Sequence, residues 1–269
     1  MVVSGSDVSP FIPVLIGFII AMTCTPAGVS GAFLLLPFQF TVLGFTGPGV
    51  TPTNLLYNVF STPGGILQYR GQGDLDRRLV SAILMGAVPG IVLGSLLRIT
   101  VFPDPGDFKR FVGLVLFGLG VNLFVRVRTR RKRLARVEGS PQRLWISGLG
   151  LAAGMIGGIY GISGGSIIAP VLVSMFGLPV RRVAPAALVA TLLTSAAGVA
   201  SFHVLDLLAA EADPARGPDW LLALLFGIGG VAGSNVGARL NKRLPEVGLR
   251  ILLGAIAIIL GISYVFAVF

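Results

Sequence analysis

The amino-acid sequence predicts an all-α, polytopic helical membrane protein, and three observations predict it. Of the 269 residues, 54% are hydrophobic and only 12% are charged, whereas about a quarter of the residues in soluble domains are charged. Long runs without any charge, such as residues 8–69 and 144–180, separate the charged residues. About 20 apolar residues span the hydrocarbon core of a bilayer as a helix. Despite a formal net charge of +10, this distribution argues against nucleic acid as a partner and for the lipid bilayer.

The two halves of the chain resemble each other, which is the second feature of the predicted fold. They align without a gap over 43 positions at an offset of 133 residues, so that Gly28-Val29-Ser30-Gly31 falls on Gly161-Ile162-Ser163-Gly164. With 38 glycines a chance coincidence is the alternative. The shared prolines and the gapless register favour a true internal repeat. We interpret residues 1–125 and 144–269 as two repeats joined by a basic linker, 126–143.

Each repeat is predicted to hold one interrupted apolar segment followed by three transmembrane helices. The interrupted segments are 12–44 and 144–177. As a continuous helix, the first would be about 50 Å long, too long for one span. Glycines and a proline break both segments, so each either crosses once as a broken helix or returns as a re-entrant hairpin. The spans that follow are predicted at about 52–69, 79–97 and 109–126 in the first repeat and at about 183–204, 219–239 and 249–268 in the second.

The positive charges decide between the two topologies. If both interrupted segments return, 17 of the 21 Lys and Arg residues lie on the side of the linker; if both cross, only 12 do. The positive-inside rule therefore favours hairpins and a cytoplasmic linker in the cell membrane. Each repeat then crosses three times, which gives the repeats inverted topology, a recurring architecture of secondary transporters. Four basic residues are then external: Arg98, Lys109, Arg110 and Arg216.

The two glycine-rich breaks are the first candidates for substrate binding. Irregular backbone at membrane depth is tolerated where protein buries it or water reaches it. In each break a serine precedes a glycine and an apolar run, which is typical of a helix N-terminus whose free N–H groups bind anions. The alternative, close helix packing through small residues, is disfavoured because Gly-x-Ser-Gly occurs twice. We expect a cavity between the turns. The candidate residues are Thr25, Gly28, Ser30, Gly31, Gly161, Ser163, Gly164, Gly165 and Ser166.

The helix after each break carries polar side chains on one face. In the first half these include Asn54 and Asn58, and in the second half Thr191, Thr194 and Ser195. Uncharged polar groups within the bilayer need partners. Substrate contact and interhelical hydrogen bonding explain them equally well. The glycines at four-residue spacing further along each repeat, by contrast, indicate close helix packing.

The sequence lacks the residues that proton relays, phosphate-binding loops and metal sites require. The 11 carboxylates lie in loops or at span ends, so no intramembrane proton relay is expected. The sequence has no phosphate-binding loop and no cluster with metal-ligand spacing. We therefore expect no catalytic residue, no metal and no cofactor. We also expect that the protein is not an enzyme. The lone Cys24 is more often a small buried hydrophobe in such a place, and the lone His203 an interfacial polar cap.

The chain resembles the sulfite exporter TauE/SafE family of membrane permeases over nearly its whole length. The resemblance depends on Gly161–Pro170 (GISGGSIIAP), on the Gly177-Leu178-Pro179 turn and on the small-residue helix 186–201. The chain departs from the family in having Ser163 where glycine is usual, and Ala32 at the matching final glycine. The resemblance implies transport of a small sulfur-containing oxyanion, such as sulfite or an organosulfonate.

These observations together predict a secondary transporter that exports a small anion by alternating access. The alternatives are an importer of sulfur or carboxylate anions, or a membrane-embedded sulfur-transfer protein that acts through Cys24. A homodimer is compatible with the sequence.

Overall fold

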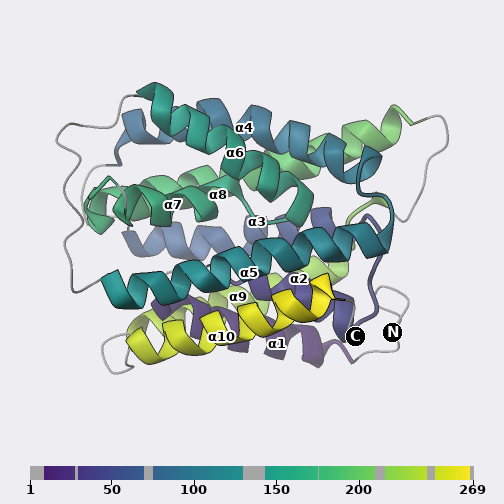
Figure 1. Cartoon of the computed structure of the whole chain (residues 1–269), viewed down its shortest axis with the longest axis horizontal. Helices are drawn as coiled ribbons and strands as arrows, with labels where there is room; N and C mark the ends of the chain where they lie inside the picture. Colours follow the sequence, from purple (N-terminus) through teal and green to yellow (C-terminus); the bar gives the residue numbers. More distant parts are fainter. Residues whose placement is uncertain are drawn as a thin grey trace.

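A computed structural model describes residues 9–27, 30–69, 75–129, 143–174, 176–209, 216–240 and 246–266. Within these residues the protein is all-helical, as the sequence predicts, and Figure 1 shows its helices packed lengthwise into one bundle. The helices are α1 (Phe11–Ala27), α2 (Ala32–Thr41), α3 (Val50–Tyr69), α4 (Arg77–Thr100), α5 (Pro105–Thr129), α6 (Arg143–Tyr160), α7 (Gly164–Ser174), α8 (Val180–Leu207), α9 (Trp220–Leu240) and α10 (Glu246–Val265).

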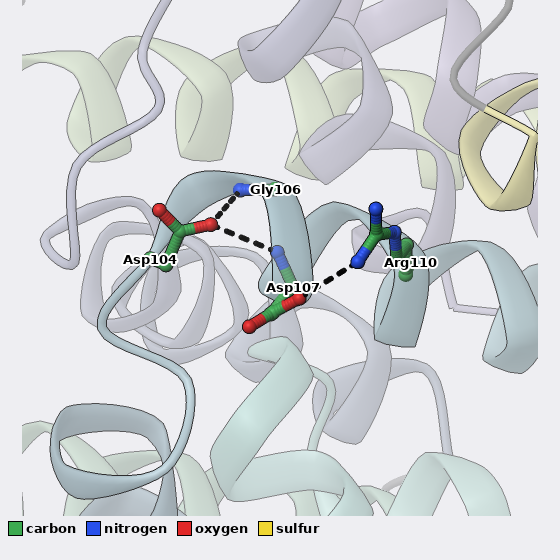
Figure 2. Close-up of polar contacts among 4 residues, drawn as sticks. All are labelled: Asp104, Gly106, Asp107 and Arg110. Carbon is green, nitrogen blue, oxygen red and sulfur yellow. Dashed lines mark hydrogen bonds and ion pairs between the residues drawn. The ribbon is translucent and has the colours of Figure 1, made fainter.

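Acidic residues cap three of the long helices, including α9, where the Asp219 carboxylate accepts a hydrogen bond from the Leu222 amide (2.8 Å). The Asp76 carboxylate accepts a hydrogen bond from the Leu79 amide (2.9 Å) at the start of α4. At the start of α5, the Asp104 carboxylate accepts hydrogen bonds from the amides of Gly106 (2.7 Å) and Asp107 (3.1 Å), as Figure 2 shows. Such caps satisfy N–H groups that have no partner within the helix.

Both interrupted segments fold back on themselves instead of forming one long helix. A Cβ atom built on Gly164 would lie 3.3 Å from the Cα of Gly154, whereas a continuous helix would separate these residues by about 15 Å. A Cβ built on Gly31 would likewise lie 3.2 Å from the Ile20 side chain. Gly161 adopts φ +93° at the second turn, a conformation that favours glycine. Helices α1–α2 and α6–α7 therefore form two helical hairpins.

Glycine ladders bring the two halves of the chain together. Gly86, Gly90 and Gly94 of α4 pack on the backbone of α6, in order along both helices, so that these helices run parallel. Helices α9 and α1 pack in the same way through Gly229, Gly233 and Gly237. Backbones approach this closely only where side chains are small, as expected from the spacing of these glycines.

Equivalent helices of the two halves meet in antiparallel orientation. Leu55 of α3 packs on Gly198 of α8, while Gly65 packs on Leu188 further along. Helices α5 and α10 are also antiparallel, since Gly113 lies beside Gly261 and Gly120 beside Gly254. The two halves of the described chain therefore point in opposite directions.

Three helical stretches are both long and apolar enough to cross a membrane, among the described residues: Arg77–Thr100, Arg182–Leu207 and Trp220–Gly237. Shorter apolar helices cover Phe11–Thr25, Ala32–Thr41, Gly164–Val173 and Ile251–Val265. Large apolar side chains such as Leu151 and Ile259 remain exposed on the outside of the bundle, as they do in proteins whose surface faces lipid. These features are those of a multi-pass membrane protein.

Candidate functional site

Ser30 organises the first turn. Its hydroxyl accepts a hydrogen bond from the amide of Ala32 (3.3 Å) and donates one to the Oδ1 of Asn58 on α3 (3.3 Å). Thr25 lies half-buried near the end of α1, and Gly28 is outside the described residues. The predicted serine therefore connects the start of α2 to the polar face of α3.

Ser163 organises the second turn in a similar way. Its Oγ accepts a hydrogen bond from the amide of Ser166 (3.4 Å), as a helix N-cap does. The two serine hydroxyls are 2.9 Å apart, and the Ser166 hydroxyl is 3.3 Å from the Oγ1 of Thr191 on α8. A Cβ on Gly165 would lie only 2.5 Å from the Ala187 carbonyl oxygen, so α7 packs directly on the backbone of α8.

The polar contacts follow the internal repeat. Ser30 contacts Asn58, and Ser163 contacts Thr191 through Ser166. Both intervals are 28 residues. The sequence therefore places a polar side chain opposite each turn at equivalent positions of the two halves.

Asn54 joins the two turns to each other. Its side-chain amide donates hydrogen bonds to the carbonyl of Ala32 (2.8 Å) and to the carbonyl of Gly161 (3.2 Å). The Tyr160 hydroxyl adds a second link, because it donates to the carbonyl of Phe33 (2.6 Å). Two segments that lie far apart in the sequence thus form one buried site.

Three buried polar atoms at this site have no hydrogen-bond partner among the described residues: Asn54 Oδ1, Asn58 Nδ2 and Ser195 Oγ. Their side chains are at most 2% exposed. The antiparallel register of α3 and α8 puts Asn58 level with Ser195. Thr194 differs, since its hydroxyl donates to the carbonyl of Ala190 in its own helix (2.7 Å). Buried polar groups without partners are costly, so these atoms need a functional explanation.

The start of α2 differs from the free helix end that the sequence suggests. The amide of Ala32 donates to the Ser30 hydroxyl, that of Phe33 to the Ser30 carbonyl (3.4 Å), and that of Leu34 to the Gly31 carbonyl (3.0 Å). These N–H groups are already engaged. At the first turn, donors for an anion therefore come from side chains, and the helix contributes its dipole.

The expected cavity between the turns is closed in this conformation. Gly31, Gly161, Ser163 and Gly164 are buried. The side chain of Asn54 lies between the turns, and the Tyr57 hydroxyl covers Gly31. Asn54 therefore bridges the two turns.

Arg98, which follows directly after the predicted span 79–97, is a residue of this region that the sequence interpretation did not select as a site residue. It lies in the last turn of α4, is fully buried, and has its guanidinium 3.7 Å from the ring centre of Phe108. Its Nε donates to the Thr51 hydroxyl (3.2 Å), which in turn donates to the carbonyl of Ile159 (3.0 Å). A buried cation therefore supports the end of α6 next to the second turn.

The lone cysteine and the lone histidine have different surroundings. Cys24 is fully buried in α1, and His203 is exposed on α8. Within the described part of the chain, no group of His, Cys, Asp and Glu has the arrangement of a metal site.

Comparisons with known proteins agree with this architecture. The profile of the family described as "Sulfite exporter TauE/SafE" matches residues 13–264. The "Probable membrane transporter protein YjnA" of Bacillus subtilis (strain 168) is 24% identical, over 94% of this chain and 98% of that protein. The "Probable membrane transporter protein YunE" of the same organism is 22% identical, over 94% of this chain and 96% of that protein. No solved structure matches.

The family match covers nearly the whole chain. Both relatives are named as probable membrane transporters, and the chain matches nearly their full length. The chain is therefore a membrane permease and not an enzyme, and it belongs to the sulfite exporter TauE/SafE family.

Proposed function

We propose that this permease is a secondary transporter of a small sulfur-containing oxyanion, such as sulfite or an organosulfonate, which it exports across the cell membrane. The observation that carries the proposal is the pair of buried, unpartnered atoms, Asn58 Nδ2 and Ser195 Oγ, at the level of the two turns. The name of the family supports the choice of sulfite.

The donors at the site suit an oxyanion. Each oxygen of a sulfite or sulfonate group accepts hydrogen bonds and donates none in its ionised form. The Asn58 amide and the hydroxyls of Ser195 and Ser166 donate without carrying a full charge. The N-terminus of α7 adds a partial positive charge. Such a site binds an anion weakly enough to release it, which a carrier requires.

Alternating access follows from the opposite directions of the two halves. The contacts of Asn54 and Tyr160 join one half to the other across the turns. Breaking them would let one half rock against the other and open the site to either side in turn. The closed arrangement is then the intermediate in which neither side has access.

Export agrees with the distribution of charges. With the basic linker in the cytoplasm, a monovalent anion that leaves a negative-inside cell gains about 2.3 kcal/mol per 100 mV. No carboxylate lies at the described site, so the membrane potential on the anion supplies the driving force in this proposal.

Flux of sulfite from proteoliposomes with an imposed potential tests the proposal. We expect saturable efflux that increases with a negative interior, and weaker flux of carboxylates such as acetate. Cys24→Ala is the matched variant, and it should transport like the wild type because the proposal gives the buried thiol no part in binding the anion. The proposal fails if neither sulfite nor a sulfonate moves, or if carboxylates move as fast.

A further inference from the structure

A basic region that shares no residue with the two turns lies at the end of the bundle where α4, α6 and α8 begin (Figure 1). A cavity of about 270 Å³ opens there. Arg78 of α4, Arg143 of α6 and Arg182 of α8 line it, together with the Ser81 hydroxyl and the apolar side chains of Leu79 and Leu178. The cavity therefore combines three guanidinium groups with an apolar wall.

The positive charge of this cavity is only partly neutralised. Asp76 accepts a hydrogen bond from the Nε of Arg182 at 2.5 Å. Among the described residues, no carboxylate lies within ion-pair distance of Arg78 or Arg143. The hydrogen bond from the Leu79 amide, and then the Arg182 guanidinium, hold the pKa of Asp76 below its usual value. Among the described residues, one carboxylate thus orients one arginine, and two further arginines line the cavity without a carboxylate partner.

The surroundings indicate a ligand at the membrane surface. Leu144 and Trp145, which follow Arg143 directly, are 78% and 67% exposed. Exposed tryptophan beside arginine is typical of the boundary between lipid tails and headgroups. Basic pockets between transmembrane helices on the cytoplasmic side bind the headgroups of anionic lipids. A volume of about 270 Å³ suits a headgroup better than a large molecule.

We propose that this cavity, here called the arginine cavity, binds a phosphate-type oxyanion. The planar forks of Arg78 and Arg143 would each offer paired donors to its oxygens. The same chemistry is present in the headgroup of an anionic phospholipid and in free phosphate. The inference does not depend on which anion the two turns transport, because the cavity shares no residue with them.

Two probes and one matched control test the proposal on the purified full-length chain. The probes are inorganic phosphate and dihexanoyl phosphatidylglycerol, with the zwitterionic dihexanoyl phosphatidylcholine as the comparison lipid. In the double variant Arg78→Gln/Arg143→Gln, we expect the Kd of at least one probe to increase tenfold or more. Arg77→Gln is the control, since it removes one positive charge, half of that removed in the double variant, from an exposed neighbour that does not line the cavity. It should change the Kd by less than twofold.

Each outcome decides the matter. Arginine-dependent binding of phosphatidylglycerol alone identifies a lipid site, and binding of phosphate alone identifies a site for a free anion. Binding of both identifies the shared oxyanion chemistry. The proposal is overturned if the wild type binds neither probe, if Arg77→Gln weakens binding as much as the double variant, or if phosphatidylcholine competes equally. Far-UV circular dichroism of the same preparations shows separately that each variant is folded.

Discussion

The first and second turns have the same position in their repeats but different chemistry. The first turn contacts the Asn58 amide through Ser30, whereas the second contacts the Thr191 hydroxyl through Ser166; Asn54 donates to both turns. An amide has two donors in a fixed plane, and a hydroxyl has one donor that rotates. The duplicated backbone therefore supplies the site, while the side chains make its two halves unequal.

The two turns also differ in how tightly they are packed. A Cβ on Gly165, at the second turn, would meet the backbone of α8, whereas a Cβ on Gly31 would meet the hydroxyl of Tyr57 and the side chain of Ile20. Arg98 supports the second turn through hydrogen bonds by way of Thr51. The comparison suggests that the second turn is a rigid half of the site and the first a more adaptable half.

Gly165→Ala should have the largest effect. Its Cβ would lie 2.5 Å from the Ala187 carbonyl oxygen and 2.6 Å from the Thr191 amide nitrogen, so α7 must move away from α8. We expect sulfite efflux to fall by about a hundredfold or more, since misplacement by about 1 Å has effects of this size at functional sites. Gly31→Ala should cost less, because side chains there can shift.

Gly148→Ala is the matched control for both glycine variants. Nothing lies within 4 Å of a Cβ at this position in α6, and alanine favours a helix by about 1 kcal/mol over glycine. Its efflux should equal that of the wild type. Wild-type efflux by Gly165→Ala would remove the distinction between a rigid and an adaptable turn.

Asn58→Ala should have the next largest effect. The variant removes the unpartnered donor and the acceptor of Ser30. Hydrogen bonds to charged groups contribute about 1.5–3 kcal/mol, so kcat/KM for sulfite should fall by about 10- to 100-fold. Thr191→Ala should cost less, since the neighbouring Ser166 and Ser195 keep their hydroxyls. A larger loss for Thr191→Ala in the same flux assay would reverse the assignment of the main donor.

Arg98→Lys should affect one turn and spare the other. Lysine keeps the charge but loses the Nε that holds Thr51, which should loosen the end of α6. In a Cys24→Ala background, the labelling rate of Ser163→Cys should rise several-fold, while that of Ser30→Cys stays unchanged. An equal increase at both positions would mean that Arg98 stabilises the whole bundle and not the second turn.

Asp76→Asn should have the smallest effect, and only in acid. The pKa of Asp76 is below its ordinary value of 3.8 in the folded protein. The ionised carboxylate therefore stabilises the fold above pH 3.8, and this stabilisation is lost as the pH falls through the lower folded pKa. Thermal unfolding should show a weaker loss of Tm below about pH 4 in Asp76→Asn than in the wild type. Asp107→Asn, in α5, is the control. If the Tm of Asp76→Asn fell as steeply below about pH 4 as that of the wild type, the stabilising role of the ionised Asp76 would be contradicted.

The breaks in the two apolar segments and the serine caps could be predicted from the sequence because they depend on local rules. Gly161 marks a turn that needs positive φ, and Ser163 precedes a helix as an N-cap does. The all-helical membrane architecture was also predictable, since long uncharged runs are a strong signal. The polar residues of α3 and α8 were found from helical spacing, and their partners were left open.

Other features depended on tertiary packing. Arg98 was not selected as a site residue because it follows directly after the predicted span 79–97, whereas α4 continues to Thr100 and folds the guanidinium against Phe108. The level pairing of Asn58 with Ser195 needs the register of two helices that are far apart in the sequence. The engaged amides at the start of α2 likewise follow from the geometry of the turn.

The most direct test of the central claim is a crystal structure with selenite, which has the charge and shape of sulfite and contains an anomalous scatterer. We predict an anomalous peak between the two turns, within hydrogen-bond distance of Asn58 and Ser195. A peak confined to the arginine cavity, or none near the turns at concentrations that saturate efflux, would contradict the claim that the paired turns bind the transported anion.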